Sequence, residues 1–286
     1  MSDIIKSILF PTDFSENAKH ALSFALKLAK ENDAKLHIMH SIEEPYDFAP
    51  MVENIKQNVT QKVEKLFDEI LEDIKRADEF KHINVKTHLF EGRSVYSILN
   101  TADDYEVDLI VMGTQGRSAL ERLFFGSTTS EVVQQTDIPI LVVPPYGEYN
   151  GFNNILFATD YGPHDLNAMK FVTDLASHHN SHLKIIHVTR KKDGKEDLLI
   201  RGLKDYVSEN ISYKDIIFEL IESDDLLKTV NGEVNKHDFS LIVTVRYQKL
   251  FSIIGKKHSK EISQGTMVPL LVMPGKPDSS HTTHNM

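Results

Sequence analysis

The stretch VMGTQGRSALERLFFGSTTSEVV, residues Val111 to Val133, decides the fold. It follows the apolar run Val107 to Met112, which predicts a buried strand. It leads into the amphipathic run Ser130 to Gln135, which predicts the start of a helix. A strand, a glycine loop and a helix in this order indicate an α/β sheet whose loop lies at the carboxyl end of a strand.

The glycines of this loop indicate a phosphate site. Gly113 and Gly116 follow the strand, where the lack of a Cβ leaves backbone N–H groups open to a ligand. Gly126 and the three hydroxyl residues after it predict an N-cap cluster suited to phosphate oxygens. The spacing fits neither a Walker A loop nor the dinucleotide motif. A structural turn in a chain that has lost its nucleotide is the alternative.

Composition narrows the class of protein. A chain of 286 residues is long enough for two domains of about 140 residues each. With 41% hydrophobic and 26% charged residues it belongs to the soluble globular class. The net charge of −10 argues against nucleic acid as a partner. The absence of cysteine, of a signal-peptide pattern and of a long apolar run predicts a cytoplasmic protein with no membrane segment.

The chain is one domain written twice. Ile8 to Asp13 returns as Ile155 to Asp160, and the same offset of 147 carries His40 onto His187. Near the ends of the copies, Thr136 to Pro144 matches Thr266 to Pro274. The Pro, Gly and Asn content of residues 144–151 predicts a linker. We therefore expect domains at 1–146 and 151–275, followed by a disordered tail at 276–286.

Periodicity gives the elements of the first copy. Strands are predicted at Ile4 to Phe10, Lys35 to His40, Asn84 to Phe90, Val107 to Met112 and Ile138 to Val143. Helices are predicted between them, the first with Ser15 as its N-cap. Alternation of strands and helices implies parallel strands with helices on both faces, and ligands bind beyond the carboxyl ends of such strands. The turn at Asp13 and the loop at Gly113 should meet there.

The second copy loses the glycine loop. Val245-Arg246-Tyr247-Gln248 stands where the first copy has Gly113-Thr114-Gln115-Gly116, and Lys256-Lys257 replaces Ser127-Thr128. β-branched and bulky residues take glycine conformations at a cost, so a phosphate cradle of the same design is not expected. Pro163 also follows Gly162, although Asp160 is kept. We expect one competent site per chain, in the first copy.

The Pro-Thr-Asp start, the glycine spacing and the Pro-Ile-Leu-Val-Val-Pro finish resemble the universal stress protein family in its tandem form. The resemblance implies two doubly wound domains, each a five-stranded parallel sheet of order 3-2-1-4-5, and an ATP site. It also implies the roles of individual residues. Pro11, Thr12 and Asp13 would line the nucleoside pocket, the backbone around Ser41 would face adenine, Met112 and Gly113 would border the ribose and α-phosphate, and Gly116, Arg117, Gly126, Ser127 and Thr128 would hold the phosphates.

Each of these roles has a structural alternative. Asp13 is a routine turn residue, Arg117 could be solvated surface, and Ser127 and Thr128 would cap a helix without any ligand. No motif supplies the base and magnesium ligands that phosphoryl transfer needs, so we expect ATP, with or without Mg, to be a ligand hydrolysed slowly or not at all.

A second class of function is an enzyme or a metal or anion site. The crevice of the second copy would be lined by Arg246, Tyr247, Lys256 and Lys257. His178 and His182 lie four apart at the end of a predicted helix, but a third zinc ligand is missing. We therefore assign no metal-binding and no catalytic residues.

The apolar fifth strands of the two copies need covering as sheet edges. Pairing of the two domains through these strands within one chain, which the resemblance implies, would cover them, and it leaves further dimerisation of chains open.

Overall fold

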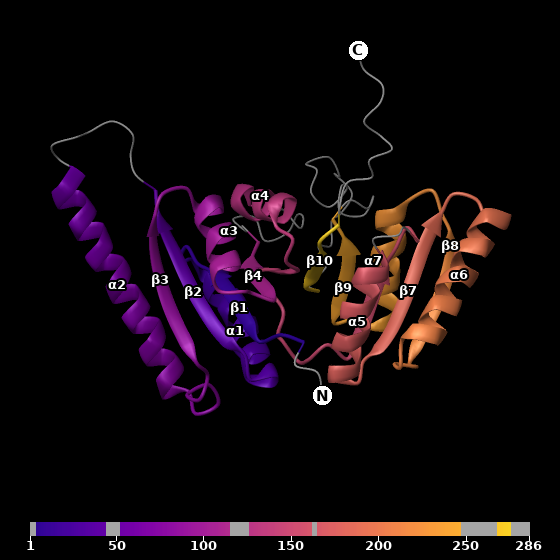
Figure 1. Ribbon diagram of the computed structural model, residues 1–286, viewed down its shortest axis with the longest axis horizontal. Helices are drawn as coiled ribbons and strands as arrows, with labels where there is room; N and C mark the ends of the chain where they lie inside the picture. Colours follow the sequence, from indigo (N-terminus) through magenta and orange to yellow (C-terminus); the bar gives the residue numbers. More distant parts are fainter. Residues whose placement is uncertain (1–3, 44–51, 115–125, 162–164, 247–267, 276–286) are drawn as a thin grey trace, which may run out of the picture. The chain divides into compact units, whose positions relative to one another are not determined.

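The computed structural model describes residues 4–43, 52–114, 126–161, 165–246 and 268–275. The chain divides into two compact units, and the division falls between Tyr149 and Asn150. We call them unit 1 and unit 2 and describe each by itself (Figure 1). The predicted tail at 276–286 lies outside the described residues.

Unit 1 is a doubly wound α/β domain. Its parallel strands lie in the order β3-β2-β1-β4-β5, which confirms the predicted 3-2-1-4-5 arrangement. The register places Ile8 of the central strand opposite both Leu36 and Leu109. Its elements are β1 (Ser7–Pro11), α1 (Glu16–Asn32), β2 (Lys35–Ile42), α2 (Val52–Arg76), β3 (Val85–Glu91), α3 (Ser94–Asp104), β4 (Leu109–Gly113), α4 (Ser127–Gln135) and β5 (Ile140–Val143).

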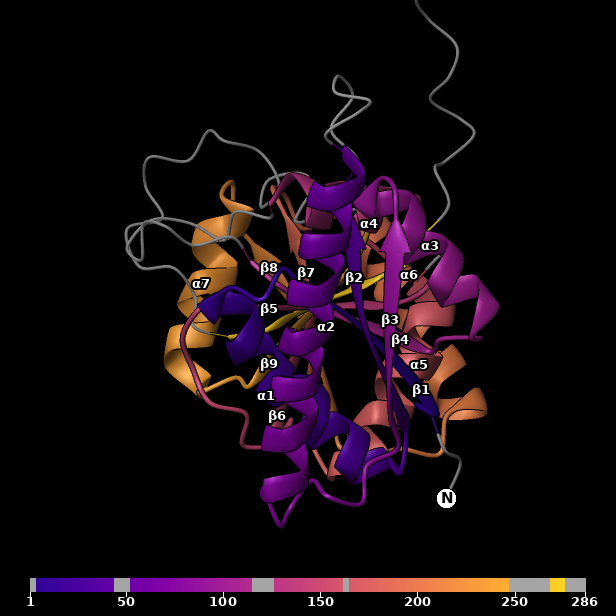
Figure 2. The same cartoon turned by 90° about the vertical axis from the view of Figure 1, so that its left-hand side faces the viewer.

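Helices cover both faces of this sheet. Helix α1 begins after Ser15, whose side chain accepts a hydrogen bond from the Ala18 N–H at 3.2 Å and so confirms the predicted N-cap. Small buried residues such as Ala21 and Ala25 let α1 approach the strands closely. Figures 1 and 2 both show α2 running alongside β3. Its side chains Val63, Phe67 and Ile74 are buried at helical spacing and so form its inward face.

Several predicted boundaries shift: β1 begins at Ser7 and not at Ile4, and β4 begins at Leu109 and not at Val107. Strand β5 begins at Ile140, two residues later than predicted, because the Ile138 N–H bonds to the Thr136 hydroxyl and Pro139 has no N–H to donate. Helix α4 begins at Ser127, three residues earlier than predicted. The predicted linker is partly tied to unit 1: Tyr149 is 5% exposed, its hydroxyl donates to Glu31, and its carbonyl accepts from the Lys27 ammonium.

Unit 2 repeats the same topology. Its strands lie in the order β10-β9-β6-β7-β8, which is the unit 1 order with the equivalent strands substituted. The stretch equivalent to α4 falls within residues 247–267, outside the described residues. The elements are β6 (Asn154–Ala158), α5 (Asp165–His179), β7 (His182–Thr189), α6 (Gly194–Asn210), β8 (Ile216–Glu222), α7 (Leu226–His237), β9 (Leu241–Val245) and β10 (Leu270–Met273).

The repeat extends to unusual backbone conformations. Phe14 and Tyr161, 147 residues apart, have φ values of 59° and 57°, and Asp33 and Asn180 have 51° and 52°. Non-glycine residues rarely adopt this left-handed region. Two copies that share such positions share the paths of their turns as well as their strand order.

Candidate functional site

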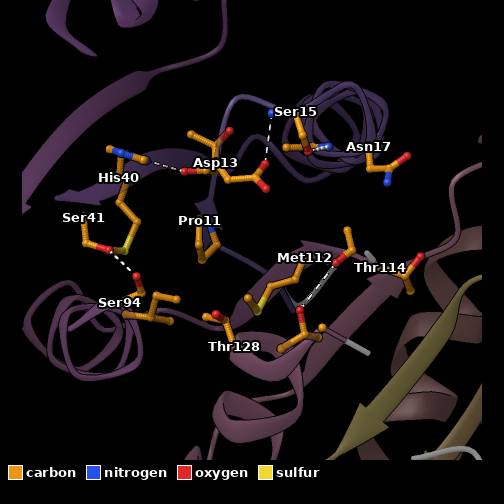
Figure 3. A pocket seen from close by; sticks show the side chains of 17 residues that line it. Pro11, Asp13, Ser15, Asn17, His40, Ser41, Ser94, Met112, Thr114 and Thr128 are labelled. Atoms are coloured by element: carbon orange, nitrogen blue, oxygen red, sulfur yellow. Dashed lines mark hydrogen bonds between the residues drawn. The ribbon is translucent and has the colours of Figure 1, made fainter. Parts of the chain in front are cut away.

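Unit 1 contains a cavity of about 460 Å³ at the carboxyl ends of β2, β1 and β4. Figure 3 shows Ser15 and Asn17 on one side of Pro11, and Ser94 and Thr128 on the other. This is the crevice where ligands of doubly wound sheets bind. Its lining consists of Pro11, Thr12, Asp13, Ser15, Asn17, Ala18, Met39, His40, Ser41, Ser94, Ile98, Met112, Gly113, Thr114, Gly126, Thr128 and Thr129.

One wall of the cavity is the turn between β1 and α1. Phe14 takes its left-handed conformation with its N–H bonded to the Thr12 hydroxyl at 3.0 Å. The His40 Nδ1–H donates to the Thr12 carbonyl at 2.7 Å, and the two rings of Phe14 and His40 lie 4.9 Å apart. Because a carbonyl only accepts, the proton of neutral His40 is on Nδ1 and its Nε2 is an acceptor.

Asp13 lies in the same turn and has a structural role. Its Oδ1 accepts a hydrogen bond from the Ser15 N–H at 3.0 Å, as a turn-forming aspartate does. Asp13 also lines the cavity and is exposed, so its second oxygen is open to solvent or a ligand. Asp13 is therefore a turn residue, as the structural alternative predicts, and it also lines the cavity, as the predicted site requires.

Gly113 lines the cavity, but the absence of its Cβ serves packing. A Cβ at this position would lie 3.1 Å from the Asn17 carbonyl oxygen and 3.5 Å from the Ala21 Cβ. Gly113 is the last residue of β4 and is not in a left-handed conformation. The expectation that its missing Cβ opens the backbone to a ligand is corrected: it makes room for α1.

The beginning of α4 differs from the predicted cap. Gly126 is the N-cap residue, and it has no side chain to accept from the first N–H groups of the helix. Ser127 and Thr128 are the first two helical residues, so neither caps α4 as predicted, and Ser127 does not line the cavity. A helix N-terminus that no side chain caps presents N–H donors and the positive end of its dipole to an outside acceptor.

The far wall of the cavity lies at the end of β2. The Ser41 hydroxyl donates to the Ser94 hydroxyl at 2.8 Å, and the Ser94 hydroxyl donates to Glu43 Oε1 at 3.1 Å. The Ser94 N–H donates to the same carboxylate oxygen at 3.3 Å. Glu43 thus places a negative charge at the first turn of α3, where the helix dipole favours it.

The structure brings most of the predicted site residues together. Gly116 and Arg117 lie outside the described residues. The predicted residues that line the cavity are Pro11, Thr12, Asp13, Ser41, Met112, Gly113, Gly126 and Thr128.

Sequence reasoning missed the lining residues that belong to helices α1 and α3. Asn17 and Ala18 belong to the first turn of α1, and Ser94 and Ile98 to α3. The start of α3 was predicted, but only the tertiary structure brings Ser94 across from β2. His40 carried a signal, because it is one of the few polar residues that the repeat keeps, as His187.

Unit 2 keeps the turn and adds a carboxylate to it. The His187 Nδ1–H donates to the Thr159 carbonyl at 2.7 Å, the Tyr161 N–H bonds to the Thr159 hydroxyl at 2.9 Å, and the rings of Tyr161 and His187 are stacked at 4.5 Å. Here Glu196 Oε2, from the first turn of α6, lies 3.1 Å from His187 Nε2. Burial, with the Glu196 charge as the smaller cause, raises the pKa of Tyr161. In unit 2 the turn after β6 is therefore packed against side chains of the same unit, those of Tyr161, His187 and Glu196.

The described end of β9 agrees with the loss of a phosphate loop in unit 2. Val245 is 2% exposed and replaces Gly113. Arg246 is 6% exposed, and its Nη2 donates to the Gly275 carbonyl at 2.8 Å. The suggested anion site of this unit would have used Arg246, which is buried against the backbone. Its other suggested residues, and Gly162 and Pro163, lie outside the described residues.

The histidine pair predicted on one helix is corrected. Helix α5 ends at His179, Asn180 is left-handed, and His182 begins β7, where its Nδ1 lies 2.6 Å from Asp215 Oδ2. Within the described part of the chain, no group of three or more His, Cys, Asp or Glu side chains is placed to hold a metal ion. Among the same residues, no helix is both long and apolar enough to span a membrane.

The fold and the crevice define the class of protein: two tandem doubly wound α/β domains, the first with a ligand-sized cavity at the carboxyl edge of its sheet. The model of the universal stress protein family matches residues 5–144. A universal stress protein of Methanocaldococcus jannaschii is 30% identical over 145 residues, which are 49% of this chain and 83% of the relative. One of Thermus aquaticus is 33% identical over 144 residues, 49% of this chain and 99% of the relative.

This chain belongs to the universal stress protein family. A solved structure of a universal stress protein from Archaeoglobus fulgidus is similar in fold over both units, with a TM-score of 0.69 and 18% identity. The match covers 94% of this chain and 96% of that chain, which confirms the tandem arrangement of two such domains.

Proposed function

We propose that unit 1 binds ATP in its cavity, and that the chain acts in stress response or signalling through a conformation that the nucleotide stabilises. The observation that carries the proposal is the first turn of α4, which opens onto the cavity without a capping side chain. The volume of about 460 Å³ lies within the range of small-ligand pockets.

The layout of the cavity favours one orientation of the nucleotide. The phosphates would lie against the N–H groups of Gly126, Ser127 and Thr128, next to the end of β4. The nucleoside would extend over Pro11 of β1 toward Ser41 of β2, because the three strands are neighbours in this order. The family resemblance supports the same assignment of ends.

Binding without rapid turnover is the proposed activity. Asp13 is the only carboxylate among the described lining residues, and one of its oxygens is used by the Ser15 N–H. Phosphoryl transfer needs a positioned base and a set of magnesium ligands as well as a phosphate cradle. A ligand that is held and not consumed can act by shifting the balance between conformations.

The test uses Gly126, whose φ of −56° and ψ of 162° suit any residue. Gly126→Asp should cap α4 as well as or better than glycine. Its carboxylate would accept hydrogen bonds from the N–H groups of α4 that would otherwise bind phosphate, and its negative charge would repel the triphosphate. We expect ATP affinity, measured by isothermal titration calorimetry on the full chain, to fall more than about tenfold.

Gly126→Asn is the matched control, since it caps without a charge and should lose less affinity than Gly126→Asp. Thermal melting of both variants checks that the fold is kept. Failure of the unaltered protein to bind ATP at millimolar concentration, or equal affinity in Gly126→Asp, would reject the proposal.

A further inference from the structure

The hydrogen-bonded row of Ser41, Ser94 and Glu43 is a polar feature of the cavity that nucleotide binding alone does not explain. It joins the end of β2 to the first residue of α3 through hydroxyl contacts of 2.8 and 3.1 Å. Both serines line the cavity, and Figure 3 shows their contact at its edge, away from Asn17 and Thr114.

The Glu43 carboxylate fixes the donor and the acceptor of both side-chain hydrogen bonds between Ser41, Ser94 and Glu43. An ionised carboxylate only accepts hydrogen bonds, and each serine hydroxyl has one proton to donate. The Ser94 proton therefore points to Glu43, and the Ser41 proton must point to Ser94. The Ser41 oxygen can therefore accept a hydrogen bond from a group in the cavity, but it has no proton left to donate.

The position of Ser41 relates these lone pairs to the base of a nucleotide. Strands β4, β1 and β2 are neighbours, so the end of β2 lies about 10 Å from that of β4 at ordinary strand spacing. With phosphates at α4, beside β4, the end of the ligand that reaches Ser41 is the base.

We propose that the row of Ser41, Ser94 and Glu43 selects a base with an amino group at this edge, and discriminates against a carbonyl at the same position. This inference rests on the proposed nucleotide binding. An amino group donates to the Ser41 lone pairs, whereas a carbonyl oxygen would face them with no proton between the two acceptors. Adenine is therefore preferred over hypoxanthine, which has a carbonyl in place of the amino group and a proton on the adjacent ring nitrogen.

The experiment compares ATP, ITP and purine riboside triphosphate, which carries only hydrogen at the same ring position, by calorimetry on the full chain. We expect ATP to bind about tenfold or more tightly than ITP, with purine riboside triphosphate between them. Ser94→Ala frees the Ser41 proton to donate, so the preference for ATP over ITP should fall to about twofold or less while purine riboside triphosphate binds as before.

Glu43→Gln should reduce the preference in the same direction, because an amide can also donate to Ser94. Ser208→Ala, at an exposed serine of α6 in unit 2, is the control and should leave all three affinities unchanged. Thermal melting confirms that each variant folds.

The outcomes separate this inference from the proposed function. Equal binding of ATP and ITP by the unaltered protein overturns the selection by Ser41 and leaves nucleotide binding in place. A preference for ATP that persists in Ser94→Ala assigns the selection to the backbone and also overturns it. If no nucleotide binds, the inference falls together with the proposed function.

Discussion

Gly113 is the residue whose interpretation changes most between sequence and structure. From the sequence, its place in a glycine loop indicates a phosphate cradle. In the structure, its missing Cβ lets the carbonyl of Asn17 in α1 approach β4. Replacement of Gly113 by valine would therefore damage packing and binding together, which is why Gly126 is the better site for a binding test.

Gly113→Ala should destabilise the protein. The new Cβ would lie 3.1 Å from a backbone oxygen, and overpacking of this kind costs about 1–3 kcal/mol of unfolding free energy. The loss of glycine's extra freedom in the unfolded chain returns only about 0.5–1 kcal/mol. Urea denaturation should show a lower midpoint with an unchanged slope.

Gly202→Ala provides the control of opposite sign. Gly202 lies inside α6 with no atom within 4 Å of a Cβ built on it, so alanine should stabilise the protein by about 0.5–1 kcal/mol. A midpoint for Gly113→Ala at or above that of the unaltered protein would contradict the packing argument.

At the scale of elements, β2 and β3 are joined by a pair of histidines. His37 is 3% exposed, and its Nδ1 lies 2.9 Å from His88 Nε2, so one ring must donate and the other accept. Burial, followed by the charges of His88, Lys86 and Lys35, lowers the pKa of His37 to about 4. Burial and the Lys86 charge also lower the pKa of His88.

This pair predicts acid sensitivity with a definite sign. Because the folded-state pKa of His37 is below the unfolded value of about 6.5, the unfolded chain takes up protons first as the pH falls. Stability from the pair is fully present above pH 6.5 or so and is lost as the pH falls toward 4. Each unit of pKa difference corresponds to about 1.4 kcal/mol.

The measurement is the urea midpoint at pH 7.5 and pH 5. The double variant His37→Gln, His88→Gln keeps side chains that can hydrogen-bond but do not titrate, so its loss of stability between the two pH values should be smaller. It should not vanish, because burial and the neighbouring His178 lower the pKa of His179 to about 4. An equal loss in the double variant would assign the acid sensitivity elsewhere.

At the scale of the whole molecule, two copies of one fold have diverged at their ligand edges. Both keep the left-handed residue and the threonine of the turn after the first strand, and both keep the histidine of the second strand that bonds to this threonine. Unit 1 leaves the His40 ring at a cavity, whereas unit 2 places Glu196 against the equivalent His187. Val245, in the place of Gly113, fills the end of β9.

We therefore expect one nucleotide per chain. Calorimetry with ATP should give a stoichiometry near one, and Gly126→Asp should weaken that one site more than about tenfold and leave no site of the original affinity, since that change lies in unit 1. A residual site of similar affinity in Gly126→Asp would place a second nucleotide in unit 2 and would contradict the assignment of a single site.

The sequence by itself determined the repeat, the alternation of strands and helices that predicts parallel pairing, and the edge of the sheet where the cavity lies, whereas the order of the strands came from the family resemblance. The first three follow from patterns that are local or recur at a fixed offset: apolar runs, helical spacing, and the return of Ile8 to Asp13 as Ile155 to Asp160. The N-cap at Ser15 was predictable for the same reason, because a cap depends on neighbours three residues away.

Only the tertiary structure decided which residues at the strand ends contact residues far away in the sequence. The contact between Gly113 and Asn17 joins a strand end to a helix 96 residues earlier, and the bond between Ser41 and Ser94 spans 53 residues. No local pattern records such contacts, because they depend on how close two elements pack. The positions of turns follow from the order of residues, whereas their chemistry follows from what the fold brings opposite them.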